Sequence, residues 1–101
     1  LAIAQDPAEA LADDALMLLA DTLCEQRLWG EAVEVYRRLA SQMPDSLLAP
    51  VALLAAAVVQ QEQLQDRHAA RQQLEALVAG YPTAAAAEEA RHRLGTMPAS
   101  E

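Results

Sequence analysis

Near the end of the chain, two carboxylates are each spaced from a histidine as in a metal-binding Glu–His pair. Glu88 and Glu89 lie four and three residues before His92, which places carboxylates and an imidazole on one helical face. Di-iron bundles use this spacing, but their sites also need a second such pair on another helix and further carboxylates. His68 is the only other histidine and belongs to no second pair. The sequence therefore favours a solvated surface pair, and we expect no metal or other cofactor.

Cys24, the only cysteine, is the candidate for nucleophilic chemistry. A catalytic thiol needs a histidine within hydrogen-bonding distance and a third group to orient it, but His68 and His92 belong to other segments. A small apolar contact inside a helix is the favoured interpretation, because free cysteine is usually a buried hydrophobe. Asp13 and Asp14 are adjacent, so they cannot share a proton and are expected to be solvated. We predict that the protein is not an enzyme.

Small apolar residues dominate the elements that must position these side chains. The chain has 101 residues, of which 53% are hydrophobic and only 3% aromatic. About a quarter of the residues are alanine, the best helix former, so an all-α fold is expected. A chain of this length forms one domain, which buries only about 60 to 65% of its unfolded surface.

The net charge of −8 limits the classes of partner. All seven basic residues are arginine and they form no basic stripe, so nucleic acid is not an expected partner. The longest apolar run, Leu47 to Val59, contains Pro50 and is shorter than the about 20 residues that span a bilayer. No export signal is visible at the start of the chain. Because Leu1 is not a methionine, we expect a soluble domain cut from a larger protein, whose other parts can carry targeting or membrane segments. The compartment stays open between bacterial periplasm and cytoplasm, with attachment to a membrane protein as a further alternative.

An internal repeat organises the chain. The pattern Ala32-x3-Tyr36-x2-Leu39-x4-Pro44 returns 38 residues later as Ala70-x3-Leu74-x2-Leu77-x4-Pro82. A fixed period of this size is typical of stacked units that bury their apolar faces against each other. Before each pattern stands a helical stripe at matching offsets: Leu16, Leu19, Ala20 and Leu23 in the first repeat, and Leu54, Ala57, Val58 and Gln61 in the second. Each repeat is therefore predicted to be a pair of helices.

This spacing resembles the tetratricopeptide repeat over roughly residues 8 to 95. In that family the first stripe is usually Trp, Leu, Gly and an aromatic residue, and the second repeat departs from it at Val58 and Gln61. The resemblance implies antiparallel helix pairs stacked as a short right-handed superhelix of about five helices. The period of 38 residues exceeds the usual 34, and such longer units resemble the divergent repeats of bacterial outer-membrane assembly lipoproteins and of the Tol-Pal coordinator.

Capping and turn signals predict the boundaries of the helices. Asp6 and Pro7 are expected to start the first helix, and Leu28, Trp29 and Gly30 to form the turn that follows it. Asp66 and Thr83 are expected to cap the fourth and fifth helices, and Gly95 to end the last one. The predicted segments are a lead-in at 1–6, one domain at 7–95 and a flexible tail at 96–101. Within the domain we expect repeat one at about 7–45, repeat two at about 46–82 and a capping helix at about 83–95.

The resemblance also implies a binding surface, because the first helix of each pair lines the concave face in that family. The positions that map to this face are Asp14, Met17, Asp21, Cys24 and Glu25 in repeat one, and Ala52, Ala55, Val59, Glu62 and Gln63 in repeat two. The Lys and Asn residues that clamp a C-terminal carboxylate in chaperone-binding members are absent. We therefore expect a protein or peptide partner with a basic or amphipathic segment. Self-association is the alternative, and Trp29 is expected to pack the turn and not to serve as an exposed anchor.

Overall fold

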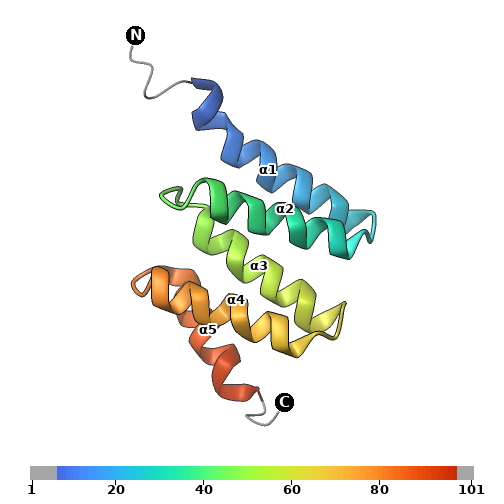
Figure 1. Cartoon of the computed structure of the whole chain (residues 1–101), viewed down its shortest axis with the longest axis vertical. Coiled ribbons are helices and arrows are strands. Elements are labelled where there is room, and N and C mark those ends of the chain that lie inside the picture. The colour runs from blue at the N-terminus through green and yellow to red at the C-terminus, as the bar shows by residue number, and fades with distance from the viewer. Residues whose placement is uncertain (1–6, 98–101) are drawn as a thin grey trace.

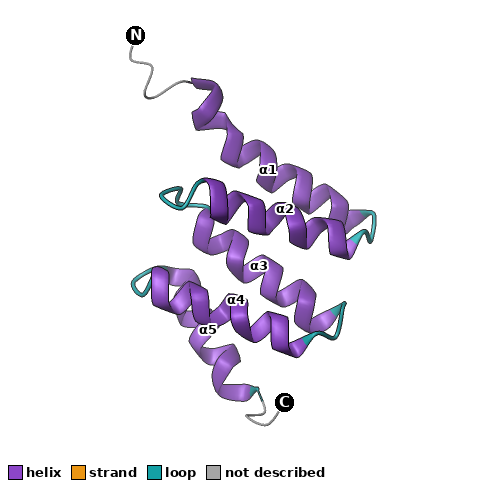
Figure 2. Cartoon of the chain, viewed as in Figure 1, coloured by secondary structure: helices purple, strands orange, loops and turns teal. Residues whose placement is uncertain are grey.

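The computed structural model describes residues 7–97, with side chains from residue 12 onward. These residues form five helices joined by loops and turns, with no strand among them (Figures 1 and 2). The helices are α1 (Pro7–Glu25), α2 (Trp29–Gln42), α3 (Ala49–Glu62), α4 (Arg67–Gly80) and α5 (Ala85–Thr96). The all-α prediction is confirmed.

Each helix runs antiparallel to its predecessor and packs mainly against its neighbours in the chain (Figure 1). α2 and α4 form one layer, and α1, α3 and α5 form the other. α3 packs on α2, α4 and α5, so it is the central element. The stack measures 52 × 32 × 16 Å and is therefore long and thin.

The turn between α1 and α2 differs from the prediction. Arg27, and not Gly30, has the left-handed backbone conformation, with φ of 64°. The amide of Leu28 donates to the carbonyl of Leu23 and that of Arg27 to Cys24, both at 2.9 Å, which closes the end of α1 as a Schellman turn. Trp29 and Gly30 are thus the first residues of α2. Trp29 is half-buried and packs on the core, as expected.

Two of the three predicted N-caps lie within the described residues, and they have opposite outcomes. Asp66 caps α4 as predicted, because its side chain accepts a hydrogen bond from the amide of Ala69 at 3.1 Å. The prediction for Thr83 is wrong, because a turn closed by the amide of Ala84 on the carbonyl of Tyr81 moves the start of α5 beyond it. α5 also runs past the predicted stop at Gly95. The predicted cap at Asp6 lies outside the described residues.

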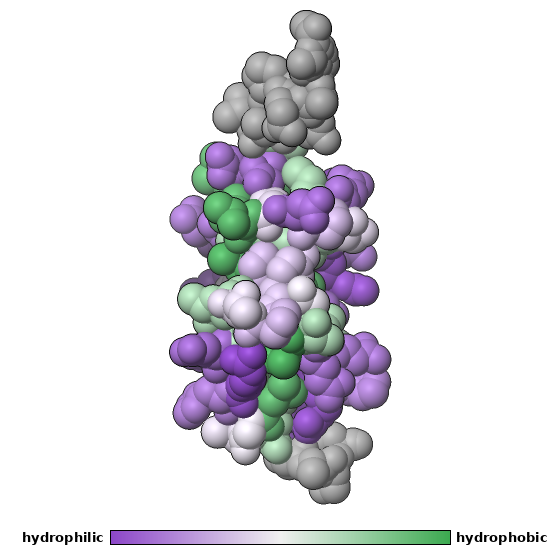
Figure 3. All heavy atoms as spheres, turned by 90° about the vertical axis from the view of Figure 1, so that its left-hand side faces the viewer, coloured by the Kyte–Doolittle hydropathy of each residue, from purple (hydrophilic) through white to green (hydrophobic). Residues whose placement is uncertain are grey.

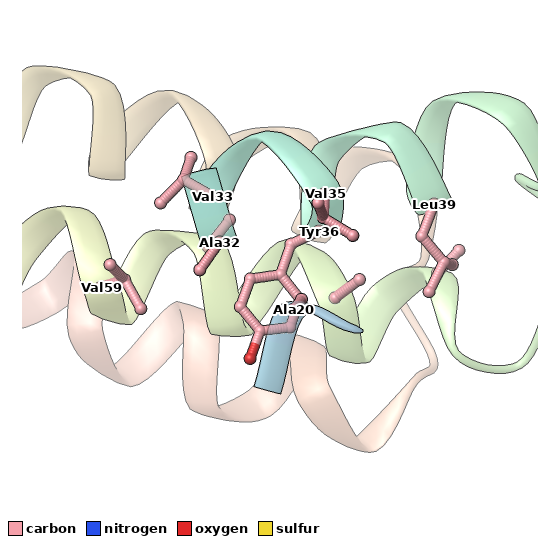
Figure 4. Close-up of a cluster of buried hydrophobic side chains, with 10 residues drawn as sticks. Ala20, Ala32, Val33, Val35, Tyr36, Leu39 and Val59 are labelled. Carbon is pink, nitrogen blue, oxygen red and sulfur yellow. The ribbon is translucent and has the colours of Figure 1, made fainter. Parts of the chain in front are cut away.

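The core consists of two clusters in the same register of the repeat. Both predicted triplets are buried: Ala32, Tyr36 and Leu39 in repeat one, and Ala70, Leu74 and Leu77 in repeat two. The first cluster joins α1, α2 and α3 (Figure 4), and the second joins α3, α4 and α5. The predicted stripe on α1 is only partly correct. Ala20 is buried, but Leu19 is 44% exposed at the edge of a hollow between α1 and α2.

Candidate functional site

A hydrogen bond from the core organises the predicted binding face of α1. Tyr36 reaches from α2 past Ala20 (Figure 4). Its hydroxyl donates a hydrogen bond to Oδ1 of Asp21 at 2.6 Å. The Sγ atom of Cys24 lies 3.7 Å from the same hydroxyl. Tyr36 is only 4% exposed, whereas Asp21 is exposed. The bond therefore fixes a surface carboxylate against a buried ring.

The environment of Tyr36 keeps its hydroxyl protonated. Burial raises the pKa of Tyr36 far above its ordinary value of about 10, and the hydrogen bond to Asp21 raises it further. A phenol that stays protonated remains a donor to the carboxylate over the whole physiological range. Asp21 is thus in part a structural residue.

The other predicted residues of α1 divide by exposure. Asp14 and Glu25 are exposed, while Met17 and Cys24 are half-buried against the first cluster. The expectation that Asp13 is solvated is wrong, because it is half-buried and accepts a hydrogen bond from the hydroxyl of Ser46. We call the surface formed by Asp14, Met17, Asp21, Cys24 and Glu25 the acidic α1 face.

α3 contributes less surface than predicted. Val59 is 8% exposed and Ala52 is fully buried, so neither presents a side chain to a partner, and Ala55 is half-buried. Glu62 and Gln63 are exposed at the end of the helix. The carboxylate of Glu62 lies 3.4 Å from the guanidinium of Arg93, which ties α3 to α5.

The side chains considered for chemistry do not assemble into a reactive site. Glu89 pairs with Arg93 at 3.0 Å, while Glu88 and His92 are exposed. His68 is exposed and lies 3.4 Å from the amide of Gln72. Within residues 12–97, no three side chains of the metal-binding types come together.

A groove that the sequence does not predict lies between α2 and α4. This α2–α4 groove has a volume of about 630 Å³, and α2 contributes Glu34, Arg37, Arg38, Ala40 and Ser41 to it. Leu53 of α3, Gln73 and Ala76 of α4, and Tyr81 complete the lining. One sequence signal was available: Gln73 takes the repeat position that Val35 holds 38 residues earlier.

A further hollow, of about 600 Å³, lies on the side of the stack that carries the α2–α3 and α4–α5 loops, and Figure 3 views this side. The hydroxyl of Tyr81 crosses from the α4–α5 loop to the carbonyl of Pro44 at 2.6 Å. Arg91 donates to the carbonyl of Pro82 at the same distance. In both repeats, therefore, a later residue binds the carbonyl of the closing proline. Leu47, on the rim of this hollow, is 91% exposed.

Helix pairs that bury the same positions against each other define an α-helical repeat protein of the solenoid class. A profile of the tetratricopeptide repeat matches residues 14–46 and 51–84, and the chain belongs to this family. Residues 47–50 fall between the two matched segments and account for the long period. A comparison with curated proteins gives no match. Among the described helices, none combines the length and apolar character needed to cross a membrane.

Proposed function

We propose that this chain is a non-enzymatic interaction module of a larger bacterial protein, and that it binds a basic or amphipathic segment of a partner protein on the acidic α1 face. Tetratricopeptide repeats generally mediate protein–protein interaction or scaffolding. The observation that carries the proposal is the exposure of Asp14, Asp21 and Glu25 on one side of α1. Their spacing of seven and four residues places them on one helical face.

The chemistry of this face suits a cationic ligand with an apolar side. The Tyr36 hydroxyl holds the carboxylate of Asp21 in one orientation, which lowers the entropic cost of pairing it with a partner's lysine or arginine. Met17 and Cys24, half-buried beside the carboxylates, offer an adaptable apolar contact. Exposed ion pairs contribute only about 0 to 1 kcal/mol each, so this charge acts mainly on the association rate and on the choice of partner.

The proposal is tested with a labelled amphipathic peptide of lysine and leucine. The variant Asp14→Arg with Glu25→Arg should slow its association by about tenfold or more at low salt and leave the circular dichroism unchanged. Asp21 is kept, because its loss would also remove the partner of Tyr36. The control is Glu34→Arg with Glu75→Arg, which makes the same change in net charge on exposed positions of α2 and α4. Equal slowing by both pairs would assign the effect to net charge, and no slowing by the first pair would exclude this face.

Self-association is the second candidate, and exposed leucines support it. Leu18 is 67% exposed and Leu19 is 44% exposed on α1. Leu19 also borders a hollow between α1 and α2 whose other apolar lining includes Leu23 and Val35. Sedimentation velocity over a range of concentrations tests this candidate. A dimer that Leu18→Glu dissociates supports it, and a monomer at high micromolar concentration excludes it.

A further inference from the structure

The α2–α4 groove carries positive charge that no described carboxylate neutralises by contact. Arg37 and Arg38 line it and are both exposed. Neither forms a hydrogen bond or ion pair with any residue from 12 to 97, whereas Arg93 is paired with Glu89 and Glu62. In a chain with 15 acidic residues and seven arginines, two guanidinium groups that line one groove and have no partner in the described residues are available to a ligand.

The same groove contains a buried amide without a protein partner. Gln73 is 8% exposed, and its side chain makes no hydrogen bond to the described part of the chain. In the described residues, one side-chain polar atom is both fully enclosed and without a partner, and it is Oε1 of Gln60. The amide atoms of Gln73 lack a partner as well, so they must be accessible to solvent. The Gln73 amide therefore reaches solvent at the groove that it lines. A buried amide with free donor and acceptor atoms can bind one peptide unit of an extended chain.

Apolar groups complete the lining between these polar ones. Leu53 of α3 is half-buried in the groove. Ala76 of α4 and Tyr81, the residue after α4, line the other side. Together they form a patch that can accept one apolar side chain. Glu34, also on the lining, limits the number of negative charges that the groove tolerates.

We propose that the α2–α4 groove binds an acidic peptide segment of a partner protein, in which a few carboxylates flank one apolar side chain. Arg37 and Arg38 would pair with the carboxylates, Gln73 with the peptide backbone, and Leu53 with the apolar side chain. Two arginines are too few to retain a polyanion on a chain with net charge −8. A short acidic peptide contacts the two arginines directly. The acidic residues elsewhere on the protein repel it only weakly, because salt screens charges that are more than about 8 to 10 Å away. This site lies in the layer opposite the acidic α1 face and takes ligands of the opposite charge, so it is independent of the proposed function.

The test measures binding of a fluorescein-labelled peptide of alternating glutamate and leucine by anisotropy. Arg37→Gln and Arg38→Gln should each weaken its binding by about fivefold and reduce its dependence on salt. Gln73→Val, which installs the residue type of repeat one, should weaken binding without loss of helicity. The control is Arg27→Gln, which removes one exposed arginine at the α1–α2 turn, outside the groove, and should change affinity by less than about twofold.

Loss with Arg37→Gln, Arg38→Gln and Gln73→Val but not with Arg27→Gln supports the proposal. Several results overturn it: no binding of the acidic peptide by the wild type, equal binding of a peptide with glutamine in place of glutamate, or equal loss with Arg27→Gln. A dimer that Arg37→Gln dissociates would also overturn it, because the groove would then hold a second copy of the chain. Asp14→Arg with Glu25→Arg should not weaken the acidic peptide, which separates this result from that of the acidic α1 face.

Discussion

Tyr36 shows how one residue joins the core to the surface. Its ring fills space between α1 and α2, so Tyr36→Ala should destabilise the protein by about 3 to 5 kcal/mol, as expected for a large buried side chain. Tyr36→Phe should cost only about 1 kcal/mol, because the exposed Asp21 can regain water. Arg37→Ala, one position further and exposed, should cost less than about 0.5 kcal/mol. Urea unfolding of the three variants measures these values, and equal midpoints would contradict the assigned core.

The hydroxyl of Tyr36 should also make stability depend on alkaline pH. Because the folded-state pKa of Tyr36 is raised, the folded protein holds this proton more tightly than the unfolded chain does. The resulting stabilisation is complete below the unfolded pKa of about 10 and is lost as the pH rises above it. Urea midpoints measured between about pH 8 and 11 should therefore fall more steeply for the wild type than for Tyr36→Phe. Parallel curves for the two proteins would show that Tyr36 ionises equally in both states.

At the residue scale, spacing predicted which positions are buried but not what their polar atoms bind. Ala32, Tyr36 and Leu39 follow from the repeat pattern and are buried. The partner of Tyr36 lies 15 residues away, and that of Ser46 lies 33 residues away, so both depend on how the helices pack. The resemblance to the repeat family predicts Val59 on the binding face, but it is buried. The sequence of α3 is apolar on all sides and gives no sign of which side is covered.

At the element scale, the caps predicted at Asp66 and Thr83 provide a matched pair of variants. Asp66→Ala should destabilise the protein by about 1 kcal/mol, because the amide of Ala69 loses its acceptor. Thr83→Ala should change stability by less than about 0.5 kcal/mol, because Thr83 is exposed and precedes the N-cap position of α5. Thermal unfolding of both variants compares them directly. A larger cost for Thr83→Ala would show that α5 starts where the sequence suggested.

In the turn between α1 and α2, the left-handed position that favours glycine is Arg27, and the glycine, Gly30, lies three residues later. Arg27 has a left-handed backbone, which costs a non-glycine residue about 1 kcal/mol, so Arg27→Gly should stabilise the protein by up to that amount. Gly30 lies in the first turn of α2, and an added Cβ would meet no atom within 4 Å. Gly30→Ala should therefore stabilise the protein by about 0.5 to 1 kcal/mol. Destabilisation by either change in urea unfolding would contradict the described turn.

The same turn shows why helix ends were harder to predict than helices. Periodicity predicted five helices, and five are present in residues 7–97. The sequence signal for a left-handed residue is glycine, but at Arg27 and Gln65 the chain uses other residues. Backbone hydrogen bonds and packing of Trp29 compensate at the first of these turns, and no local pattern encodes that compensation.

For the whole molecule, the number of helices that each helix packs against predicts which helices unfold locally first. α1 packs chiefly on α2 at one end of the stack, whereas α3 packs on α2, α4 and α5. In a solenoid each unit is stabilised by its neighbours, so the terminal helices should open first. Native-state hydrogen exchange should show the slowest amides in α3 and faster exchange in α1. Uniform protection along the chain would indicate that the five helices unfold only as one unit.

The alanines of α3 set a length scale for the stack. Ala49, Ala52 and Ala56 are fully buried where α3 meets the first cluster, so the distance between the two repeats is limited by methyl groups. A larger residue there can be accommodated only if the helices move apart. Such a residue would act as a wedge between the repeats and would alter the curvature of both faces while leaving their own side chains unchanged. A substitution at one of these buried alanines would therefore change the pitch of this short superhelix without changing the chemistry of its surfaces.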